Sequence, residues 1–269
     1  MNVHTTTTSA TDAAVPEHEA FRSACRAEVA AQAADRELRA LSSAWLVRAS
    51  ERRYSYHFRA CGLPIIQFPQ DIVALQELLW EVQPDLVVET GVARGGSLVM
   101  YASQLVLHEC AAAAGAAPAA QPRRVLGIDI HIRPENRAAI EAHPFGSRIE
   151  LIEGSSVDPT VVAKVHARAA QAERVLVCLD SNHTHSHVLA ELMAYAPLVA
   201  LGSYLVVFDT VVEHLPKALY PDRPWGPGDN PLTAVREFLA HHPEFEVDRS
   251  IDQRLLLTVA PEGFLKRVR

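Results

Sequence analysis

Two aspartates each close an apolar run in this sequence, and their positions indicate a metal site. Asp180 ends 175-VLVCLD-180 and Asp209 ends 204-YLVVFD-209. Apolar runs of this length are typical of buried parallel strands, whose carboxyl ends meet at the same edge of a sheet. Two carboxylates held together away from water repel each other, and a bound cation relieves that repulsion. Because hard oxygen ligands with positions left for water suit Mg²⁺, we predict a magnesium site at Asp180 and Asp209. The alternative is that one aspartate caps the following helix and the other faces water.

Histidines follow the first aspartate closely, in 181-SNHTHSH-187. His183 lies nearest to the strand end, so it is the first candidate for a general base, with His214 second and Asp180 itself third. His183 and His187 have the i, i+4 spacing of zinc ligands, but the HExxH motif and a suitably placed cysteine are absent from the sequence. We expect His185 and His187 to face along a helix without a role in chemistry.

A glycine-rich turn follows another apolar run, in 86-LVVETGVARGGS-97. Its spacing is GxxxGG, which differs from the GxGxxG dinucleotide fingerprint and lacks the GK[ST] ending of a phosphate-binding loop. Glu89 would repel a pyrophosphate but would suit the positively charged amino acid portion of S-adenosylmethionine. We predict cofactor contacts from this stretch at Glu89, Thr90, Gly91, Ala93, Gly95 and Ser97.

Two further turns stand at successive strand ends and support the same cofactor. The run 124-RVLGID-129 ends in Asp129, where an acid accepts hydrogen bonds from ribose hydroxyls, and Ile130 follows it. Next, 153-EGSSVD-158 carries Ser155 and Ser156 at the place where adenine contacts usually lie. Together with Asp180, these residues complete the predicted S-adenosylmethionine site. For any one turn alone, the alternative is that its glycines only close a loop.

An irregular segment rich in proline, glycine and aromatic residues, 213-EHLPKALYPDRPWGPGDNP-231, follows the second aspartate. Long irregular segments at the ligand end of a sheet are usually functional lids. We predict that Tyr220 and Trp225 stack on the substrate, a sugar or polyketide face, and that Tyr56 and His57 approach the same mouth. The alternative is a rigid surface loop in which the aromatic residues only pack.

Strands and helices alternate regularly from about residue 70 onward, which predicts an α/β fold. The expected strands are Leu86–Glu89, Arg124–Ile130, Ile149–Glu153, Val175–Asp180, Tyr204–Asp209, Phe245–Val247 and Leu255–Val259. The expected helices are Ile72–Val82, Ser97–His108, Glu135–Ala142, Thr160–Ala170, His185–Ala194 and Leu232–His241. Five strand–helix units and two closing strands are the pattern of a Rossmann-like class I methyltransferase. We therefore expect a seven-stranded, mostly parallel sheet with helices on both faces.

The chain is predicted to have three parts. Residues 1–16 are expected to be a flexible tail, residues 17–84 an N-terminal helical extension, and residues 85–269 the Rossmann-like domain. The helical extension is expected to be a cover or an oligomer contact, with packing against its own domain as the alternative. The alanine-rich run at 111–120 is interpreted as a loop insertion.

Composition excludes several classes of function. With 269 residues, 49% of them hydrophobic, the chain can bury a full core. A net charge of −7 argues against nucleic-acid binding, and no apolar run is long enough to span a membrane. The four cysteines have no paired spacing, and the first residues lack the features of a signal peptide. We expect a cytoplasmic homo-oligomer that binds a small-molecule or glycosylated acceptor.

Several blocks of sequence resemble one known family. They are ETGVARGGSLV, GIDIHIRPENRAAIEAHP, LIEGSSVDP, LDSNHTHSHVLAELMAYAPLV, GSYLVVFDT and PDRPWGPGDNP. From about Tyr54 to Arg269 the chain resembles the family called cephalosporin hydroxylases. Despite that name, the family is similar to S-adenosylmethionine-dependent O-methyltransferases, including the methoxylation protein of cephamycin biosynthesis, rhamnosyl O-methyltransferases and the Mg²⁺-using macrocin-type sugar methyltransferases.

The resemblance implies that Glu89, Gly91 and Asp129 bind the cofactor and that Asp180 and Asp209 bind the metal. One position departs from the family pattern. Some relatives carry two adjacent acids at the end of the fifth strand, where this chain has Phe208 before Asp209. A third carboxylate is therefore missing there, and Asn182 or a water could take its place.

The expected function is that of an S-adenosylmethionine-dependent O-methyltransferase acting on a hydroxyl of a sugar or glycosylated natural product, assisted by Mg²⁺. One alternative is a cofactor-binding partner protein without this chemistry, which only the Phe208 departure favours. The other alternative is a hydroxylase. Its nearest sequence pattern is Asp129-Ile-His131, the reverse of the HxD order of non-haem iron oxygenases.

Overall fold

The computed structural model describes residues 10–113 and 122–269. Residues 1–9 of the predicted tail, and most of the predicted loop at 111–120, lie outside the described residues. Helix α1 begins at Ala10, within the segment that was expected to be a tail, and α4 continues to Ala113.

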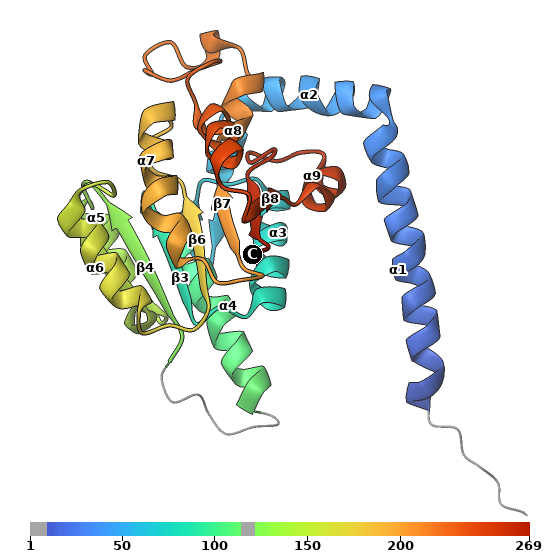
Figure 1. Cartoon of the computed structure of the whole chain (residues 1–269), viewed down its shortest axis with the longest axis horizontal. Coiled ribbons are helices and arrows are strands. Elements are labelled where there is room, and N and C mark those ends of the chain that lie inside the picture. The colour runs from blue at the N-terminus through green and yellow to red at the C-terminus, as the bar shows by residue number, and fades with distance from the viewer. Residues whose placement is uncertain (1–9, 114–121) are drawn as a thin grey trace, which may run out of the picture.

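A seven-stranded sheet forms the centre of the molecule (Figure 1). Its strands are β3 (Leu86–Thr90), β4 (Arg124–Asp129), β5 (Ile149–Glu153), β6 (Val175–Leu179), β7 (Tyr204–Val207), β8 (Phe245–Val247) and β9 (Phe264–Arg267). They lie in the order β5-β4-β3-β6-β7-β9-β8, and β9 runs antiparallel to both of its neighbours. This arrangement confirms the predicted Rossmann-like, mostly parallel sheet. The strand order reverses between β3 and β6, which is where a ligand crevice is expected.

The prediction for the last strand was wrong. Leu255–Val259 was expected to pair, but it follows α9 (Arg249–Leu255) as irregular chain, and Phe264–Arg267 is the strand instead. The reason is a buried side chain, because the backbone N–H of Val259 donates to Oδ2 of Asp71 at 3.0 Å and not to a strand. An apolar run indicates burial, but burial alone does not distinguish a strand from an ordered loop.

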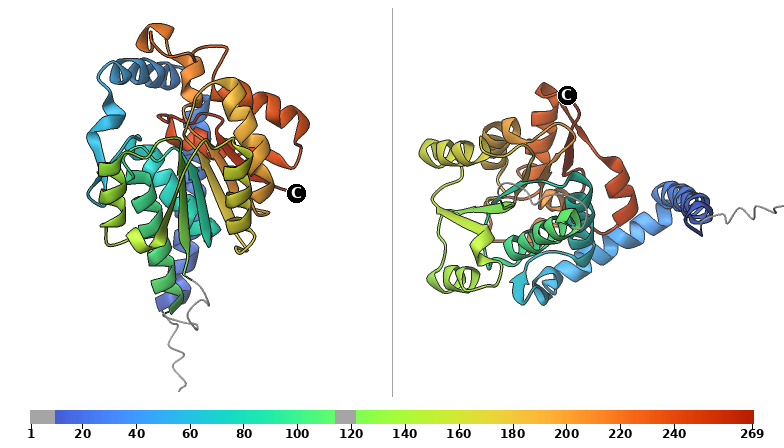
Figure 2. Two further views of the ribbon diagram at one scale, coloured as in Figure 1. Left: turned by 90° about the vertical axis from the view of Figure 1, so that its left-hand side faces the viewer. Right: turned by 90° about the horizontal axis from the view of Figure 1, so that it is seen from below.

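Helices cover both faces of the sheet and form two separate cores (Figure 2). One core joins the sheet to α3 (Pro69–Val82), α4 (Gly96–Ala113), α5 (Pro134–Glu141) and α9. The other joins it to α6 (Pro159–Ala169), α7 (His185–Tyr195) and α8 (Pro231–His241). Short 3₁₀ helices are η1 (Tyr54–His57), η2 (Gly146–Arg148), η3 (Ala196–Leu198), η4 (Thr210–His214) and η5 (Lys217–Leu219). Within the described ranges, no helix combines the length and apolar character that crossing a bilayer requires.

The N-terminal segment forms an arm of two helices that stands beside the domain (Figure 1). Asp35 separates helix α1 (Ala10–Ala34) from helix α2 (Arg36–Ser50). Its carboxylate caps α2 by accepting from the N–H of Leu38. Large apolar side chains on this arm are exposed, Phe21 by 69% and Leu41 by 62%. A side-chain amide joins the arm to α9, because Gln32 Nε2 donates to the carbonyl of Gln253 at 2.8 Å.

A short hairpin of β1 (Phe58–Ala60) and β2 (Leu63–Ile65) follows the arm, inside the segment 17–84 that was expected to be a helical extension. The chain from this hairpin passes directly over the glycine-rich turn. A Cβ atom built on Gly96 would lie 2.2 Å from the carbonyl oxygen of Pro64, so only glycine allows the two backbones to pack this closely.

Candidate active site

A cavity of about 570 Å³ opens at the carboxyl ends of β3, β4, β6 and β7. Its size lies in the range of small-molecule and cofactor sites. Most of the residues predicted for the cofactor, metal and substrate line it. These are Tyr56, Gly91, Ala93, Gly95, Ser97, Asp129, Ile130, Ser155, Ser156, Asp180, His183, Asp209, Tyr220 and Trp225.

Asp180, His183 and Asp209 form a cluster in this cavity, and one ligand atom from each lies within 4.8 Å of the others. His183 Nε2 is 3.0 Å from Asp209 Oδ2. Burial raises the pKa of Asp180 well above its ordinary value, and the negative charge of the nearby Asp209 raises it further. Such a site favours a cation or a proton between the acids. The two predicted acids are therefore brought together, and His183 joins them as a third member.

The backbone at the end of β7 turns the Asp209 side chain toward the cavity. Asp209 has φ 55°, in the left-handed region that aspartate tolerates better than most residues. The preceding Phe208 is 1% exposed and belongs to the hydrophobic core, so its side chain faces away from the cluster. The amide oxygen of Asn182 accepts from the N–H and hydroxyl of Thr184, both at 2.9 Å, and is not free to replace a missing carboxylate.

The glycine-rich turn packs against the strand that carries Asp180. A Cβ atom on Gly91, whose φ is +93°, would lie 2.0 Å from the carbonyl oxygen of Asp180. Ala93 also has a positive φ, 45°, which is uncommon for alanine. Its carbonyl accepts from Nδ2 of the buried Asn136 at 2.7 Å, so a side chain from α5 holds the strained turn in place.

Glu89 lies beneath the cavity and does not line it. The side chain is 1% exposed and accepts from Ser97 Oγ at 2.6 Å and from the Tyr101 hydroxyl at 2.9 Å. Burial raises the pKa of Glu89 to about 8, against which these two hydrogen bonds act. The predicted contact between Glu89 and a cofactor therefore stays a prediction, whereas the contact that the structure contains is with Ser97 at the start of α4.

Asp129 stands at the cavity wall and supports the same turn. Its Oδ2 accepts from the backbone N–H groups of Val92 at 2.9 Å and Ala93 at 3.3 Å, and its Oδ1 accepts from that of His131 at 3.1 Å. A carboxylate has about four lone-pair positions, so these bonds leave a position for a ligand hydroxyl.

A polar network that no sequence pattern indicated lies beside Ser156. His187 lines the cavity, and its Nε2 lies 3.1 Å from Ser156 Oγ and 3.3 Å from Ser181 Oγ. Ser181 Oγ also donates to the fully buried Glu191 at 2.6 Å. His187 was expected to face along its helix, but it faces the cavity, and its lack of a role in chemistry stays a prediction. Its position in the first turn after β6 would have indicated the contact with the cavity, because such turns point into the crevice.

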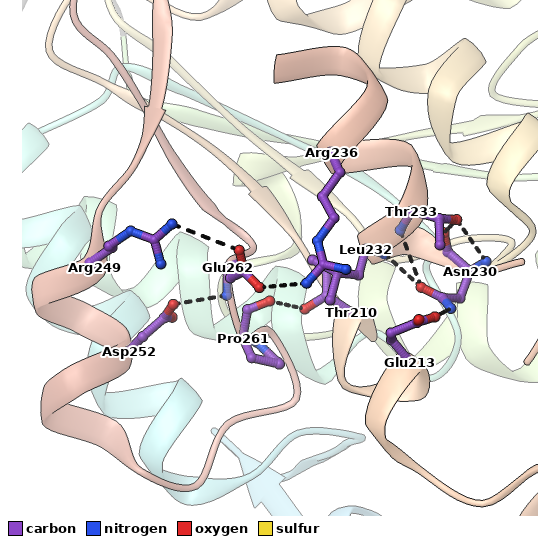
Figure 3. Close-up of polar contacts among 10 residues, drawn as sticks. All are labelled: Thr210, Glu213, Asn230, Leu232, Thr233, Arg236, Arg249, Asp252, Pro261 and Glu262. Carbon is purple, nitrogen blue, oxygen red and sulfur yellow. Dashed lines mark hydrogen bonds and ion pairs between the residues drawn. The ribbon is translucent and has the colours of Figure 1, made fainter. Parts of the chain in front are cut away.

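Hydrogen bonds of Lys217 and Glu213 hold the loop after η4 that carries Tyr220 and Trp225. Lys217 Nζ donates to the carbonyls of Arg223 and Trp225, each at 2.6 Å. At its base, Glu213 accepts from the Asn230 amide and from the N–H of Gly228 at 2.8 Å. Figure 3 shows Glu213 beside Asn230, the residue that caps α8, and shows Thr210 bonded to Pro261. These bonds make the loop an ordered wall of the cavity.

Trp225 packs on His183 of the cluster, and Tyr220 packs on Trp225. The Trp225 ring meets the His183 imidazole edge-on at 5.2 Å, and the Tyr220 ring lies 4.7 Å from Trp225. Trp225 is only 8% exposed, so most of its surface contacts protein. A second cavity of about 310 Å³ begins beyond Tyr220 and shares Ser55, Tyr56, Tyr220 and Arg223 with the first.

Three predicted residues besides Glu89 do not reach the cavity. Thr90 is fully buried at the end of β3, whereas His57 and His214 are exposed on η1 and η4. The alternative base His214 therefore lacks a position from which it could act in this arrangement. In contrast, Gln67, which no sequence motif singles out, lines the cavity and donates to Asp180 Oδ2 at 3.2 Å.

A sheet with this strand order and a cavity at its reversal point define a Rossmann-like protein of the methyltransferase type. Solved structures share the fold. The structure described as "cmcI-D160 Mg-SAM" matches with a TM-score of 0.52 at 17% identity, covering 80% of this chain and 78% of that chain. The "CmcI-N160 apo-structure" matches with a TM-score of 0.52 at 19% identity, covering 80% and 77%.

The sequence comparisons identify the family. The model of the family "Rhamnosyl O-methyltransferase/CmcI" matches residues 52–268, and the chain belongs to this family. A rhamnosyl O-methyltransferase of Mycobacterium bovis is 32% identical over 200 residues, which is 73% of each chain. One from Mycobacterium leprae is 29% identical over 207 residues, covering 77% of this chain and 81% of the relative. The predicted resemblance is thereby confirmed.

Proposed function

We propose that this protein is an O-methyltransferase that moves a methyl group from S-adenosylmethionine to a sugar hydroxyl, with Mg²⁺ in the site. The observation that carries the proposal is the convergence of Asp180, His183 and Asp209 on the cavity that the glycine-rich turn and Asp129 also line. Relatives named rhamnosyl O-methyltransferases support a sugar or glycosylated acceptor.

The residues present fit the cofactor. Gly91 is the residue that fits in the turn, because a side chain there would collide with the carbonyl of Asp180. Asp129 keeps an acceptor position for a hydroxyl. Ser155, Ser156 and Ile130 line the cavity farther along, where a flat base would lie. The structure described as "cmcI-D160 Mg-SAM" has the same fold, which is consistent with this assignment.

The donor set also fits Mg²⁺. The carboxylates of Asp180 and Asp209 can approach one ion, and hard oxygen donors with places left for water suit magnesium. Since the Phe208 side chain is part of the core, its presence does not remove a ligand from the cluster. This takes away the one feature that favoured a partner protein without chemistry. A hydroxylase of the non-haem iron type would need two histidines and one carboxylate, and this cluster has one histidine and two carboxylates.

Methyl transfer to a hydroxyl requires alignment of the two reactants and removal of one proton. When bound, S-adenosylmethionine supplies the methyl group and Mg²⁺ supplies positive charge beside the acceptor oxygen. His183 takes the hydroxyl proton at Nδ1, because its Nε2 is engaged by Asp209 at 3.0 Å. Asp209 stabilises the resulting imidazolium, and the Trp225 ring fixes the plane of the imidazole.

The two neighbouring cavities support an acceptor larger than one sugar. The hydroxyl to be methylated lies beside His183, and Tyr56, Tyr220 and Arg223 line both cavities. An acceptor with a group attached to its sugar can therefore extend past Tyr220.

We further propose that the protein acts in the cytoplasm, without nucleic acid or membrane, and that it self-associates. Its free cysteines support the first proposal, and the exposed apolar residues of the arm support self-association.

The test is calorimetric titration of S-adenosylmethionine in Mg²⁺ and then in EDTA, followed by methylation of a rhamnosylated acceptor. We expect binding in both and methyl transfer only with Mg²⁺. Asp180→Asn keeps the shape of the side chain but loses its charge, so it should abolish the metal dependence together with most turnover. Binding without any effect of metal on transfer would refute the Asp180–Asp209 site, and no binding would refute the methyltransferase assignment.

A further inference from the structure

Gln67 is a buried polar residue in a segment that precedes the Rossmann-like domain. Its side chain is 3% exposed, yet it lines the main cavity. It follows β2 and precedes α3, so it reaches the site from outside the strand ends that supply most of the other groups. Nothing in its local sequence resembles a ligand-binding motif.

The backbone that carries Gln67 is fixed on both sides. Before it, Pro64 and Ile65 lie against the glycine-rich turn, with the Ile65 Cα 2.8 Å from the position of a Cβ on Gly96. After it, the buried Phe68 stands at the start of α3, followed by Pro69. Because both flanks are packed against the domain, the backbone at Gln67 is held at the cavity wall.

The two ends of this amide have different surroundings. Nε2 donates to Asp180 Oδ2 at 3.2 Å. Oε1 is buried, but it has no hydrogen-bond donor within the parts of the chain that are described. A carboxylate can only accept, so the amide nitrogen faces Asp180 and the amide oxygen is left for another donor. Buried acceptors are normally satisfied, and an exception at a cavity wall points to a ligand.

The charges around Gln67 select the kind of donor. Asp180 is its direct partner, and Asp209 lies in the same cluster, so a positively charged donor is favoured over a neutral one. S-adenosylmethionine has two cationic centres, but the sulfonium has no N–H or O–H to donate. Its α-ammonium has three donors, as a lysine ammonium does.

We infer that Gln67 is a cofactor-binding residue, whose Nε2 holds Asp180 and whose Oε1 accepts a hydrogen bond from the α-ammonium of the cofactor. This inference rests on the proposed function and adds a specificity to it. The Gln67 oxygen recognises the amino group of the cofactor, whereas Asp129 is placed for its hydroxyls. The same amide thereby connects the cofactor to the acid cluster.

The test compares S-adenosylhomocysteine with its desamino analogue, which lacks only the ammonium, by calorimetry in EDTA. We expect Gln67→Leu to weaken S-adenosylhomocysteine binding about tenfold or more, because a hydrogen bond to a charged group is lost. Binding of the desamino analogue should change little. The matched control is Gln70→Leu, since Gln70 also has a buried Oε1 with no donor among the described residues but does not line the cavity. Should Gln67→Leu fail to fold, Gln67→Met keeps an unbranched chain of similar length and serves in its place.

The outcomes separate this inference from the proposed function. Equal weakening of both ligands would overturn it, because Gln67 would then act only by positioning Asp180. Weakening that occurs in Mg²⁺ but not in EDTA would also overturn it, since the oxygen would then serve water on the cation. If the wild-type protein binds neither S-adenosylmethionine nor S-adenosylhomocysteine, the proposed function itself fails and this inference fails with it.

Discussion

Replacing Gly91 with alanine tests whether the glycine-rich turn and the Asp180 strand pack as closely as the structure indicates. Gly91 has φ +93°, and an added Cβ would lie 2.0 Å from the Asp180 carbonyl oxygen and 2.6 Å from its carbon. Non-bonded carbon and oxygen normally approach to only about 3.3 Å. The end of β6 must therefore move by more than an ångström, or the turn must open.

A matched glycine separates this collision from the backbone effect. Gly62 has φ +94°, but a Cβ there would meet no atom within 4 Å. Both substitutions carry the left-handed penalty of about 1–2 kcal/mol. Only Gly91→Ala adds overpacking, worth about 1–3 kcal/mol. We therefore expect Gly91→Ala to lower the free energy of unfolding by about 2–5 kcal/mol and Gly62→Ala by about 1–2 kcal/mol.

Urea denaturation measures the two free energies of unfolding, and calorimetry with S-adenosylhomocysteine measures the site. In Gly91→Ala, binding should be lost or strongly weakened, because Asp180 is displaced together with its neighbours. In Gly62→Ala, binding should persist, because Gly62 does not line the cavity. If the two variants unfold and bind alike, the close packing of Gly91 on Asp180 is refuted.

Three further predictions test other contacts. Glu89→Gln should flatten the pH dependence of the free energy of unfolding between about pH 5 and pH 8. The pKa of Glu89 in the folded protein, about 8, is above the ordinary 4.5, so the unfolded chain loses its proton first as the pH rises. The free energy of unfolding of the wild type therefore falls by up to about 1.4 kcal/mol per pH unit, which chemical denaturation at several pH values would detect. His183→Ala should lower kcat about 100-fold or more while retaining S-adenosylmethionine binding. His214→Ala, its exposed control, should leave kcat unchanged, and the reverse result would assign the base to His214. Asn136→Ala should weaken S-adenosylhomocysteine binding and lower the melting temperature, since the Ala93 turn loses its 2.7 Å hydrogen bond; unchanged values in both would show that the turn holds itself.

The sequence predicted the parts of the site that stand at strand ends. Asp129, Asp180 and Asp209 each follow an apolar run, and the rule that parallel strands end at one edge is enough to bring them together. The sheet order follows from the same alternation of strands and helices. These features are local in the sequence or follow from topology, so a pattern can reveal them.

Other parts depend on contacts that local sequence does not encode. Gln67 reaches Asp180 across 113 positions and Asn136 reaches Ala93 across 43, and neither lies in a motif. The direction of the Glu89 side chain depends on Ser97 and Tyr101, in the first and second turns of the next helix.

The misplaced last strand has the same cause as these omissions. The apolar run at Leu255–Val259 was expected to join the sheet, but a carboxylate on α3 accepts a hydrogen bond from its backbone. Asp71 binds the Val259 N–H and the Thr258 hydroxyl, so the run is buried without becoming a strand. Burial was therefore predicted correctly from the sequence, whereas the partner that satisfies the buried backbone was not.

The passage of residues 54–68 over the glycine-rich turn has a consequence for how this enzyme can be divided or recombined. The Rossmann-like unit alone contains the strand ends but lacks one wall of its own cavity, which Tyr56, Pro64 and Gln67 provide. Since the Pro64 carbonyl leaves no space for any side chain at position 96, the wall and the turn are fitted to each other. A chimaera that exchanges the Rossmann-like unit between relatives should therefore move residues 54–68 with it, because the functional module begins at the hairpin segment and not at the first strand of the sheet.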